Sequence, residues 1–324
     1  MFNYRFLFVI ALALGITPLV GCNPSEVNET PTESTASEAE LASNTEATES
    51  QLEVMVSIPP QKYFVERIGG DRVKVNILLP SGANPATYEP KPQQLQSLSD
   101  ADAYVRIHVP FEKAWWDRIS SANSDLQVID LTQDINRMPM AFEHHHGHDE
   151  AHGHNEVEAE TGTNPDPHIW LSPPLVKEQA QTIYNALAKL DPQNEPMYQE
   201  NLTAFVAEIE QLDRDIEATL TNVADRTFMV FHPSWGYFAD AYNLEMIPIE
   251  VGGNEPSAAE TSQLIKEAKA ENIEVIFAQL QFSTRSAETI ASEIGGEVIL
   301  IDPLAEDWLS NMRKVADTFE QVLS

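Results

Sequence analysis

From residue 52 onward, short apolar runs rich in valine and isoleucine alternate with longer amphipathic stretches. Dense runs of this kind indicate strands that are buried on both faces. We expect strands at 52–58, 73–79, 103–109, 126–130, 228–231, 246–251, 273–279 and 297–301. We expect helices at 60–69, 91–100, 111–121, 174–190, 257–271 and 284–294. The repeated strand and helix pattern predicts an α/β fold with two sets of mostly parallel strands flanked by helices.

A long helical pattern separates the two sets. From about residue 194 to 224, apolar residues recur at steps of three or four positions. A helix of about 30 residues would be about 45 Å long, so we predict one rigid helix that joins two lobes. Two helices broken near Asp213 are the alternative. The predicted organisation is an N-terminal lobe over 51–192, a linking helix over 193–225 and a C-terminal lobe over 226–324.

The first 22 residues have the pattern of a bacterial export signal. An apolar run over 6–20 follows Arg5, is interrupted by Pro18 and is too short to span a membrane as a helix. The sequence then reads Leu-Val-Gly-Cys, which resembles the lipoprotein processing box and implies a lipidated Cys22. An ordinary secretory signal followed by a free thiol is the alternative. We expect an extracytoplasmic protein anchored by lipid to the cell membrane, periplasmic if the organism is Gram-negative.

The next segment, 23–50, has the composition of a tether. It contains seven glutamates, no lysine or arginine, and many serines and threonines. Such a composition buries too little apolar surface to offset the entropy of ordering, so we predict a disordered acidic linker ahead of the folded part.

The charge and the cysteine content exclude several classes of function. The chain has 51 acidic and 19 basic residues, a formal net charge of -32, and therefore lacks the basic surface that nucleic-acid binding needs. Cys22 is its one cysteine, which excludes internal disulfides and a thiolate zinc site.

A histidine-rich loop is expected over 143–165, where no strand or helix periodicity is present. Imidazole and carboxylate groups together bind divalent transition metals, so we predict that this loop gathers metal with modest affinity. A solvated loop without a role is the alternative. Its histidines are His144, His145, His146, His148, His152 and His154.

The other three histidines lie in more structured surroundings. His168 occurs in DPHIWLSP, His232 occurs in FHPSWGYF, and His108 ends a predicted strand. Asp302 directly follows another predicted strand. Open parallel sheets bind ligands at the carboxyl ends of their strands, so these side chains could meet between the lobes. A buried structural role is the alternative for each histidine taken alone.

Several motifs occur in order along the folded part of the chain. They are SGANPATYEPKPQQL (81–95), VPFE (109–112), DPHIWLSP (166–173), FHPSWGYFADAYNL (231–244), EPSAAE (255–260), QFS (281–283) and IDPLAEDW (301–308). With these motifs the chain from 52 to 324 resembles the metal-binding proteins of ABC uptake systems for zinc and manganese. The resemblance implies two α/β lobes joined by one long helix, a metal held between them by four ligands, and an ABC permease with its ATPase as partners. We also expect a monomer.

The resemblance supplies three of the four ligands. His168 and His232 match two ligand histidines, and Asp302 matches the ligand carboxylate. The fourth position departs from the family, because Ala86 stands in NPATYEP where a histidine is usual. Water or His108 is the favoured replacement. Glu112, Glu89 and a histidine of the 143–165 loop are further candidates.

The donor set favours zinc as the transported ion. Two imidazoles and one carboxylate suit zinc better than manganese, which prefers oxygen ligands; manganese or iron is the alternative. We expect capture and delivery of the ion rather than catalysis, because the sequence contains no HExxH, nucleophile or phosphate-loop signature. A zinc hydrolase is the enzymatic alternative, and a surface adhesin or metal buffer is the other.

Overall fold

The computed structural model describes residues 51–141 and 164–324, which belong to one compact unit. The predicted signal peptide and Cys22, the acidic tether over 23–50, and the six histidines of the predicted loop lie outside the described residues. No helix among the described residues has the length and apolar character needed to cross a membrane.

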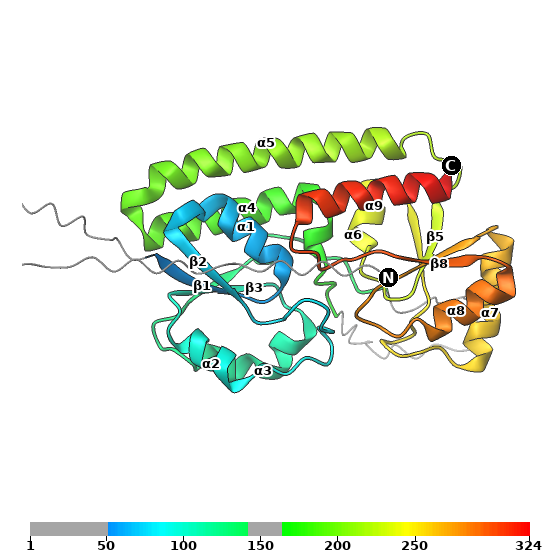
Figure 1. The fold of residues 1–324 in the computed structure, drawn as a ribbon, viewed down its shortest axis with the longest axis horizontal. Helices are drawn as coiled ribbons and strands as arrows, with labels where there is room; N and C mark the ends of the chain where they lie inside the picture. The colour runs from blue at the N-terminus through cyan, green and yellow to red at the C-terminus, as the bar shows by residue number, and fades with distance from the viewer. Residues whose placement is uncertain (1–50, 142–163) are drawn as a thin grey trace, which may run out of the picture. The chain divides into compact units, whose positions relative to one another are not determined.

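The first lobe is built on a four-stranded parallel sheet (Figure 1). Its strands, in the order β2-β1-β3-β4, are β1 (Leu52–Val56), β2 (Val73–Ile77), β3 (Ala103–Arg106) and β4 (Gln127–Asp130). Two helices, α1 (Pro59–Gly69) and α4 (Pro173–Leu190), cover one face, and α2 (Pro92–Ser99) and α3 (Pro110–Ser120) cover the other. Short 3-10 helices complete this part of the chain at η1 (Gly70–Arg72), η2 (Ile169–Leu171) and η3 (Pro192–Asn194).

The second lobe repeats this plan with another parallel sheet. Its strands, in the order β6-β5-β7-β8, are β5 (Thr227–Val230), β6 (Glu245–Pro248), β7 (Val275–Ala278) and β8 (Glu297–Leu300). The helices α6 (Gly236–Ala241) and α9 (Trp308–Leu323) lie on one side, and α7 (Ala258–Ala270) and α8 (Arg285–Ile294) on the other (Figure 1). The predicted fold class is confirmed, and every strand pairing described is parallel.

One continuous helix, α5 (Glu195–Leu220), follows the first lobe and leads into the second. It packs against α1 and α4 and also against α9, so it contacts helices of both lobes. The buried residues of α5 recur at helical spacing and form one apolar stripe. They are Tyr198, Leu202, Phe205, Ile209, Leu212, Ile216 and Leu220. The helix passes through Asp213 without a break, which excludes the alternative of two shorter helices. The lobe boundaries at 192 and 225 stay a prediction.

One large apolar cluster extends through both lobes. Buried residues of the first sheet, of α5 and of α9 form one cluster that also contains Trp235 and Phe238 beside the second sheet. A second, smaller cluster lies under α7 and α8. Because the larger cluster is shared, the relative position of the lobes is maintained by apolar burial as well as by the linking helix.

Two tryptophans connect the lobes within this core. The Trp170 indole Nε1 donates a hydrogen bond to the carbonyl of Pro303 at 2.7 Å, and the Trp308 indole donates to the carbonyl of Trp170 at 2.7 Å. Both side chains are about 1% exposed. The two bonds satisfy both buried indole N–H groups and hold the segment after His168 against the segment after Asp302.

Two helices were absent from the sequence prediction. The pattern of α9 is present in Trp308, Met312, Val315 and Phe319, which lie at steps of three or four residues and are all buried. The helix α6 is only six residues long and is therefore hard to recognise from periodicity. The strands are also shorter than expected, because buried residues such as Ile107 and Val109 continue the apolar runs into turns beyond the strand ends.

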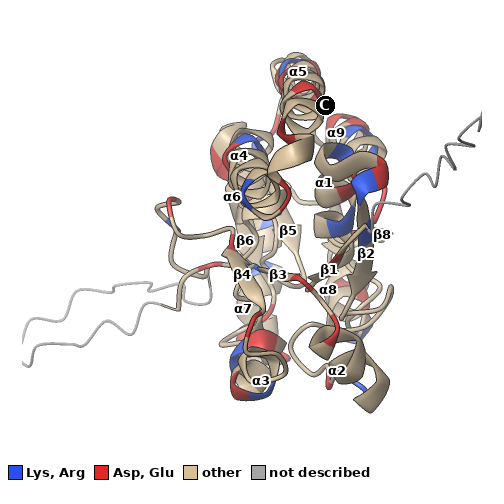
Figure 2. Ribbon diagram, turned by 90° about the vertical axis from the view of Figure 1, so that its left-hand side faces the viewer, with Lys and Arg blue, Asp and Glu red and all other residues tan. Residues whose placement is uncertain are grey.

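Acidic and basic residues occur mainly in the helices that flank the sheets (Figure 2), and most of those described are exposed or partly exposed. Their ion pairs include Lys62 with Glu306 at 2.5 Å, which joins α1 to the segment before α9, and Arg67 with Glu208, which joins α1 to α5. Partly exposed pairs of this type contribute little to stability, so the apolar core dominates the packing of the lobes.

Removing the central aromatic ring of the second lobe should destabilise the protein strongly. The Phe319 ring lies 4.6 Å from that of Phe277 and 4.7 Å from that of Phe228, centroid to centroid. We expect Phe319→Ala to lower the free energy of unfolding by about 3–5 kcal/mol, measured by urea denaturation. The neighbouring exposed change Glu320→Ala is the control, and a similar loss in both variants would contradict the packing assigned to Phe319.

Candidate metal centre

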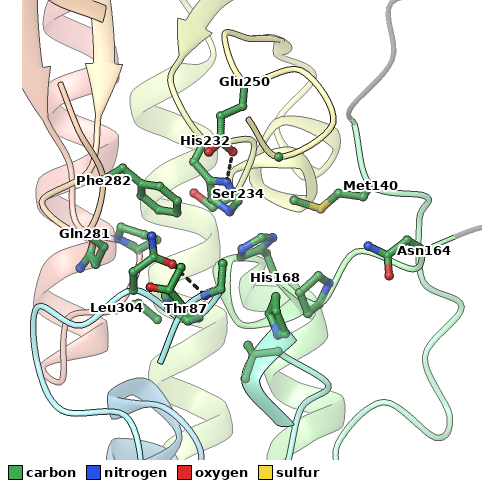
Figure 3. A pocket seen from close by; sticks show the side chains of 18 of the residues that line it. Thr87, Met140, Asn164, His168, His232, Ser234, Glu250, Gln281, Phe282 and Leu304 are labelled. Carbon is green, nitrogen blue, oxygen red and sulfur yellow. Dashed lines mark hydrogen bonds and ion pairs between the residues drawn. The ribbon is translucent and has the colours of Figure 1, made fainter. Parts of the chain in front are cut away.

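A cavity of about 210 Å³ lies between the lobes, at the ends of strands from both sheets (Figure 3). The first lobe contributes Asn84, Pro85, Ala86, Thr87, Val109, Pro110, Met140, Asn164, Pro167, His168 and Trp170. The second contributes His232, Ser234, Glu250, Gly253, Gln281, Phe282, Pro303 and Leu304. Two of the predicted ligands, His168 and His232, therefore reach the same cavity from opposite sides.

His168 is held by a carboxylate two residues earlier in the chain. Asp166 Oδ1 lies 2.7 Å from His168 Nδ1 and accepts a hydrogen bond from the backbone N–H of His168 at 2.9 Å. Tyr237 supports this turn from the second lobe, because its hydroxyl donates to the Asp166 carbonyl at 3.0 Å. His168 is the N-cap residue that precedes η2, and its ring packs against that of Trp170.

His232 occupies a matching environment beyond the end of β5. Its Nδ1 lies 2.5 Å from Glu250 Oε2, and its ring stacks on Phe282 at 4.4 Å between centroids. Burial lowers the pKa of His232, with Glu250 opposing this shift and His168 reinforcing it. The ring is therefore held in the neutral form that can bind a metal ion.

The two imidazoles are close and similarly oriented by their partners. Their centroids are 5.3 Å apart with an angle of 73° between the rings. A carboxylate accepts the proton of each Nδ1, which leaves the lone pair on each Nε2 as the available donor. This carboxylate–histidine arrangement is the one that commonly orients histidine ligands in metal sites.

Asp302 lies close to this cavity without lining it. Its Oδ1 accepts hydrogen bonds from Gln281 Nε2 at 3.0 Å and from the backbone N–H of Leu304 at 2.9 Å. Within the described ranges, no group of three histidine, cysteine or acidic side chains is close enough to hold an ion as it stands. The structure thus brings together two of the three predicted ligands.

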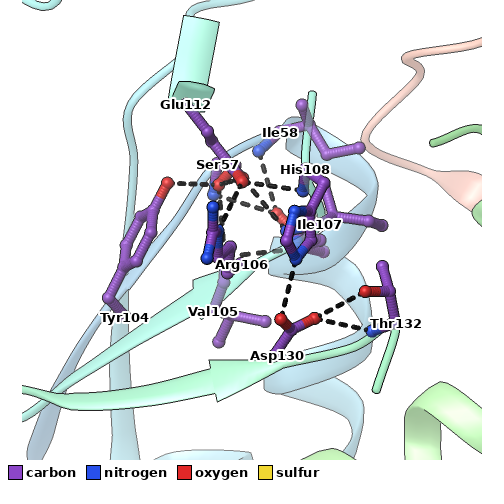
Figure 4. A network of polar contacts seen from close by, with 11 residues as sticks. Ser57, Ile58, Tyr104, Val105, Arg106, Ile107, His108, Glu112, Asp130 and Thr132 are labelled. Carbon is purple, nitrogen blue, oxygen red and sulfur yellow. Dashed lines mark hydrogen bonds and ion pairs between the residues drawn. The ribbon is translucent and has the colours of Figure 1, made fainter. Parts of the chain in front are cut away.

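The structure places Glu112 in a buried polar network of the first lobe (Figure 4). Glu112 does not line the cavity, although Val109 and Pro110 just before it do. Its carboxylate is 0% exposed and accepts the backbone N–H groups of Ile107 at 3.0 Å and His108 at 2.7 Å, as well as the Ser57 hydroxyl. Burial raises the pKa of Glu112, and these hydrogen bonds oppose the shift. Glu112 thus stabilises the turn between β3 and α3.

His108 also has a structural position in this turn. Its φ of 63° lies in the left-handed region, and its Nε2 lies 2.7 Å from Asp130 Oδ2. Burial favours a higher pKa for Asp130, but hydrogen bonds from His108 and Thr132 outweigh it and lower this pKa to about 2. His108 is directed toward β4 and does not line the cavity.

Ala86 does line the cavity, in the position where the family resemblance suggested a missing histidine. Its backbone N–H donates to Asn84 Oδ1 at 2.7 Å, which orders the loop around it. Glu89, the weaker candidate replacement, is exposed and does not line the cavity.

The two carboxylates that hold the histidines were not predicted from the sequence. Asp166 was detectable because it lies two residues before His168 in the same motif. Glu250 follows the apolar run of β6, so the strand-end argument applied to His232 and Asp302 could have found it as well.

Comparison with known proteins identifies the family. The family described as zinc-uptake complex component A, periplasmic, matches residues 54–322, and the chain belongs to this family. The high-affinity zinc uptake system protein ZnuA of Bacillus subtilis (strain 168) is 30% identical over 78% of this chain and 79% of its own length. The zinc-binding protein AdcA of Streptococcus pyogenes is 28% identical over 83% of this chain, which spans 56% of that longer protein.

Solved structures agree with this assignment. A crystal structure of ZnuA is 48% identical, covers 85% of this chain and 100% of its own chain, and superposes with a TM-score of 0.77. A deletion mutant of ZnuA with zinc bound is also 48% identical, with a TM-score of 0.76 over 85% of this chain and 99% of its own. The family is one of solute-binding transport proteins, not of enzymes.

The lowered pKa of His232 should make the metal-free protein less stable in mild acid. Below about pH 6.5 the unfolded chain protonates this ring more than the folded protein does, so the free energy of unfolding decreases as the pH falls through this range. We expect His232→Gln to reduce the difference in unfolding free energy between about pH 7.5 and about pH 5.5, measured with urea. An unchanged pH dependence in this variant would contradict the assigned environment.

Proposed function

We propose that this protein is the extracytoplasmic solute-binding component of an ABC importer and that it captures zinc in the cavity between its lobes. The observation that carries the proposal is the pair of imidazoles that meet there, each with its Nδ1 held by a carboxylate. Two lone pairs directed from opposite lobes can bind one divalent ion.

The proposed ligands are His168 Nε2, His232 Nε2 and the carboxylate of Asp302, with water at the position that Ala86 leaves without a donor. Imidazole nitrogen with one carboxylate oxygen is a common zinc environment, whereas manganese prefers more oxygen ligands. The structural roles of His108 and Glu112 favour water over either residue.

The relatives support zinc as the transported ion. They include proteins named for high-affinity zinc uptake and for zinc binding, and the neighbouring solved structures include a ZnuA with zinc bound. In the proposed cycle the protein exchanges most of the water around the ion for side chains and then delivers the ion to a membrane permease that an ATPase drives. Binding needs both histidines neutral and the aspartate ionised.

The segments outside the described residues have proposed roles in the same cycle. Lipid on Cys22 would anchor the chain to the membrane, and the acidic stretch over 23–50 would act as its tether. The histidines between 144 and 154 would gather metal near the cavity. We propose that the protein acts as a monomer, because the cavity is built from the two lobes of one chain.

The cavity and the histidine-rich segment should contribute unequally to zinc affinity. We expect His232→Ala to weaken zinc binding by orders of magnitude and deletion of 144–154 to weaken high-affinity binding little, both measured by calorimetry. His108→Asn is the matched control, because it removes a histidine outside the cavity and asparagine tolerates a positive φ. The opposite ranking would place the high-affinity site in the loop.

Restoring a donor at position 86 should tighten zinc binding. Ala86 lines the cavity, so Ala86→His would place a third imidazole beside His168 and His232. We expect a higher zinc affinity in competition with a chromophoric chelator, with one zinc bound per protein. Ala270→His, at the exposed end of α7, is the control, and an equal gain in both variants would show that position 86 does not face the ion.

A further inference from the structure

The chain beyond β7 lies between the two proposed ligand positions of the second lobe. In the sheet order β6-β5-β7-β8, β7 separates β5, which leads to His232, from β8, which leads to Asp302. Gln279 is 0% exposed and Gln281 lines the cavity, whereas Leu280 between them is 65% exposed. Leu280 and Gln281 lie in a turn, which the Phe282 N–H closes by donating to the Gln279 carbonyl at 3.2 Å. From this segment the Gln279 amide reaches His232 and the Gln281 amide reaches Asp302.

Gln279 fixes the backbone of His232. Its Oε1 accepts the His232 N–H at 3.3 Å, and its Nε2 donates to the His232 carbonyl at 2.9 Å and to the Ser234 hydroxyl at 3.3 Å. Both ends of this buried amide have partners, so Gln279 holds its ligand segment firmly.

Only one end of the Gln281 side-chain amide takes part in holding Asp302. Its Nε2 donates to Asp302 Oδ1 at 3.0 Å, whereas its buried Oε1 has no hydrogen-bond partner among the described residues. A buried carbonyl without a partner costs free energy and offsets part of what the Nε2 bond contributes. The contact between Gln281 and Asp302 is therefore easier to exchange than the contact between Gln279 and His232.

The contact between Gln281 and Asp302 joins a residue that lines the cavity to a residue that does not. Gln281 lines the cavity together with His232, and Figure 3 shows its side chain beside the cavity, on a segment different from the one that carries His232. Asp302 is bound to Gln281 and to the backbone of Leu304 and does not line the cavity. An ion held by His168 and His232 would thus compete with Gln281 for this carboxylate.

We infer that Gln281 is a positioning residue that retains Asp302 in the metal-free protein and yields it to the ion on capture. His232 is then the fixed ligand of the second lobe, and Asp302 is the exchangeable one. On release Asp302 returns to the Gln281 amide, so the carboxylate has a partner in both states and the ion dissociates more readily. The inference rests on the proposed function, because it requires Asp302 to bind the metal.

The test is a double-mutant cycle with zinc as the probe. Gln281→Met removes the N–H donor and keeps a side chain of similar length. We expect zinc binding about tenfold tighter, and zinc release about tenfold slower, because one hydrogen bond to a carboxylate no longer competes with the ion. In the Asp302→Asn background the same change should have no effect, since the exchanging carboxylate is absent.

The measurements are competition with a chromophoric zinc chelator for affinity and stopped-flow transfer to excess chelator for release. Gln181→Met is the matched control, because Gln181 is an exposed glutamine of α4 that donates to Asn185. Thermal unfolding of each metal-free variant verifies folding, and Gln281→Leu serves as a second variant without the donor.

Weaker or unchanged zinc binding in Gln281→Met, or equal tightening in the Asp302→Asn background, would overturn the inference. His232→Ala separates this failure from failure of the proposed function. If His232→Ala abolishes zinc binding while Asp302→Asn leaves it unchanged, capture in the cavity stands and the role of Gln281 is refuted. If His232→Ala leaves zinc binding intact, the proposed site itself is wrong.

Discussion

The arrangement of the cavity depends on two hydrogen bonds donated by the indoles of Trp170 and Trp308. Trp170 donates to the Pro303 carbonyl and Trp308 donates to the Trp170 carbonyl, within an apolar core that both lobes share. These bonds lie next to His168 on one side and to the segment after Asp302 on the other. Apolar burial and two satisfied indoles thus keep the lobes in place in this structure.

Much of the fold could be predicted because buried parallel strands leave a strong pattern of valine and isoleucine. All the expected strands are present, and the stripe from Tyr198 to Leu220 forms one helix as expected. The strand order within each sheet could not be predicted, because it depends on contacts between residues far apart in the sequence. The helix α9 was missed although its apolar spacing is regular, and the six residues of α6 carry too little periodicity to detect.

Only part of the candidate site was predicted. His168 follows from its motif, and His232 follows from its motif and its position after a strand; both reach the cavity. Asp166 and Glu250, which orient the rings, were missed although their positions in the sequence carry a signal. The contact of Gln281 with Asp302 could not be predicted, because it depends on how the ends of neighbouring strands meet. His108 shows the reverse case, since a histidine at a strand end serves a left-handed turn and pairs with Asp130. The ligand set itself stays a proposal.

The carboxylates behind the two imidazoles have a consequence for which cations the cavity can retain. Asp166, Glu250 and the nearby Asp302 give the surroundings of the rings a negative charge, of which a divalent ion offsets two units. A sodium or potassium ion offsets only one unit and leaves more carboxylate charge uncompensated, which is costly among buried groups. Charge balance therefore favours divalent over monovalent ions before any difference in coordination geometry is considered.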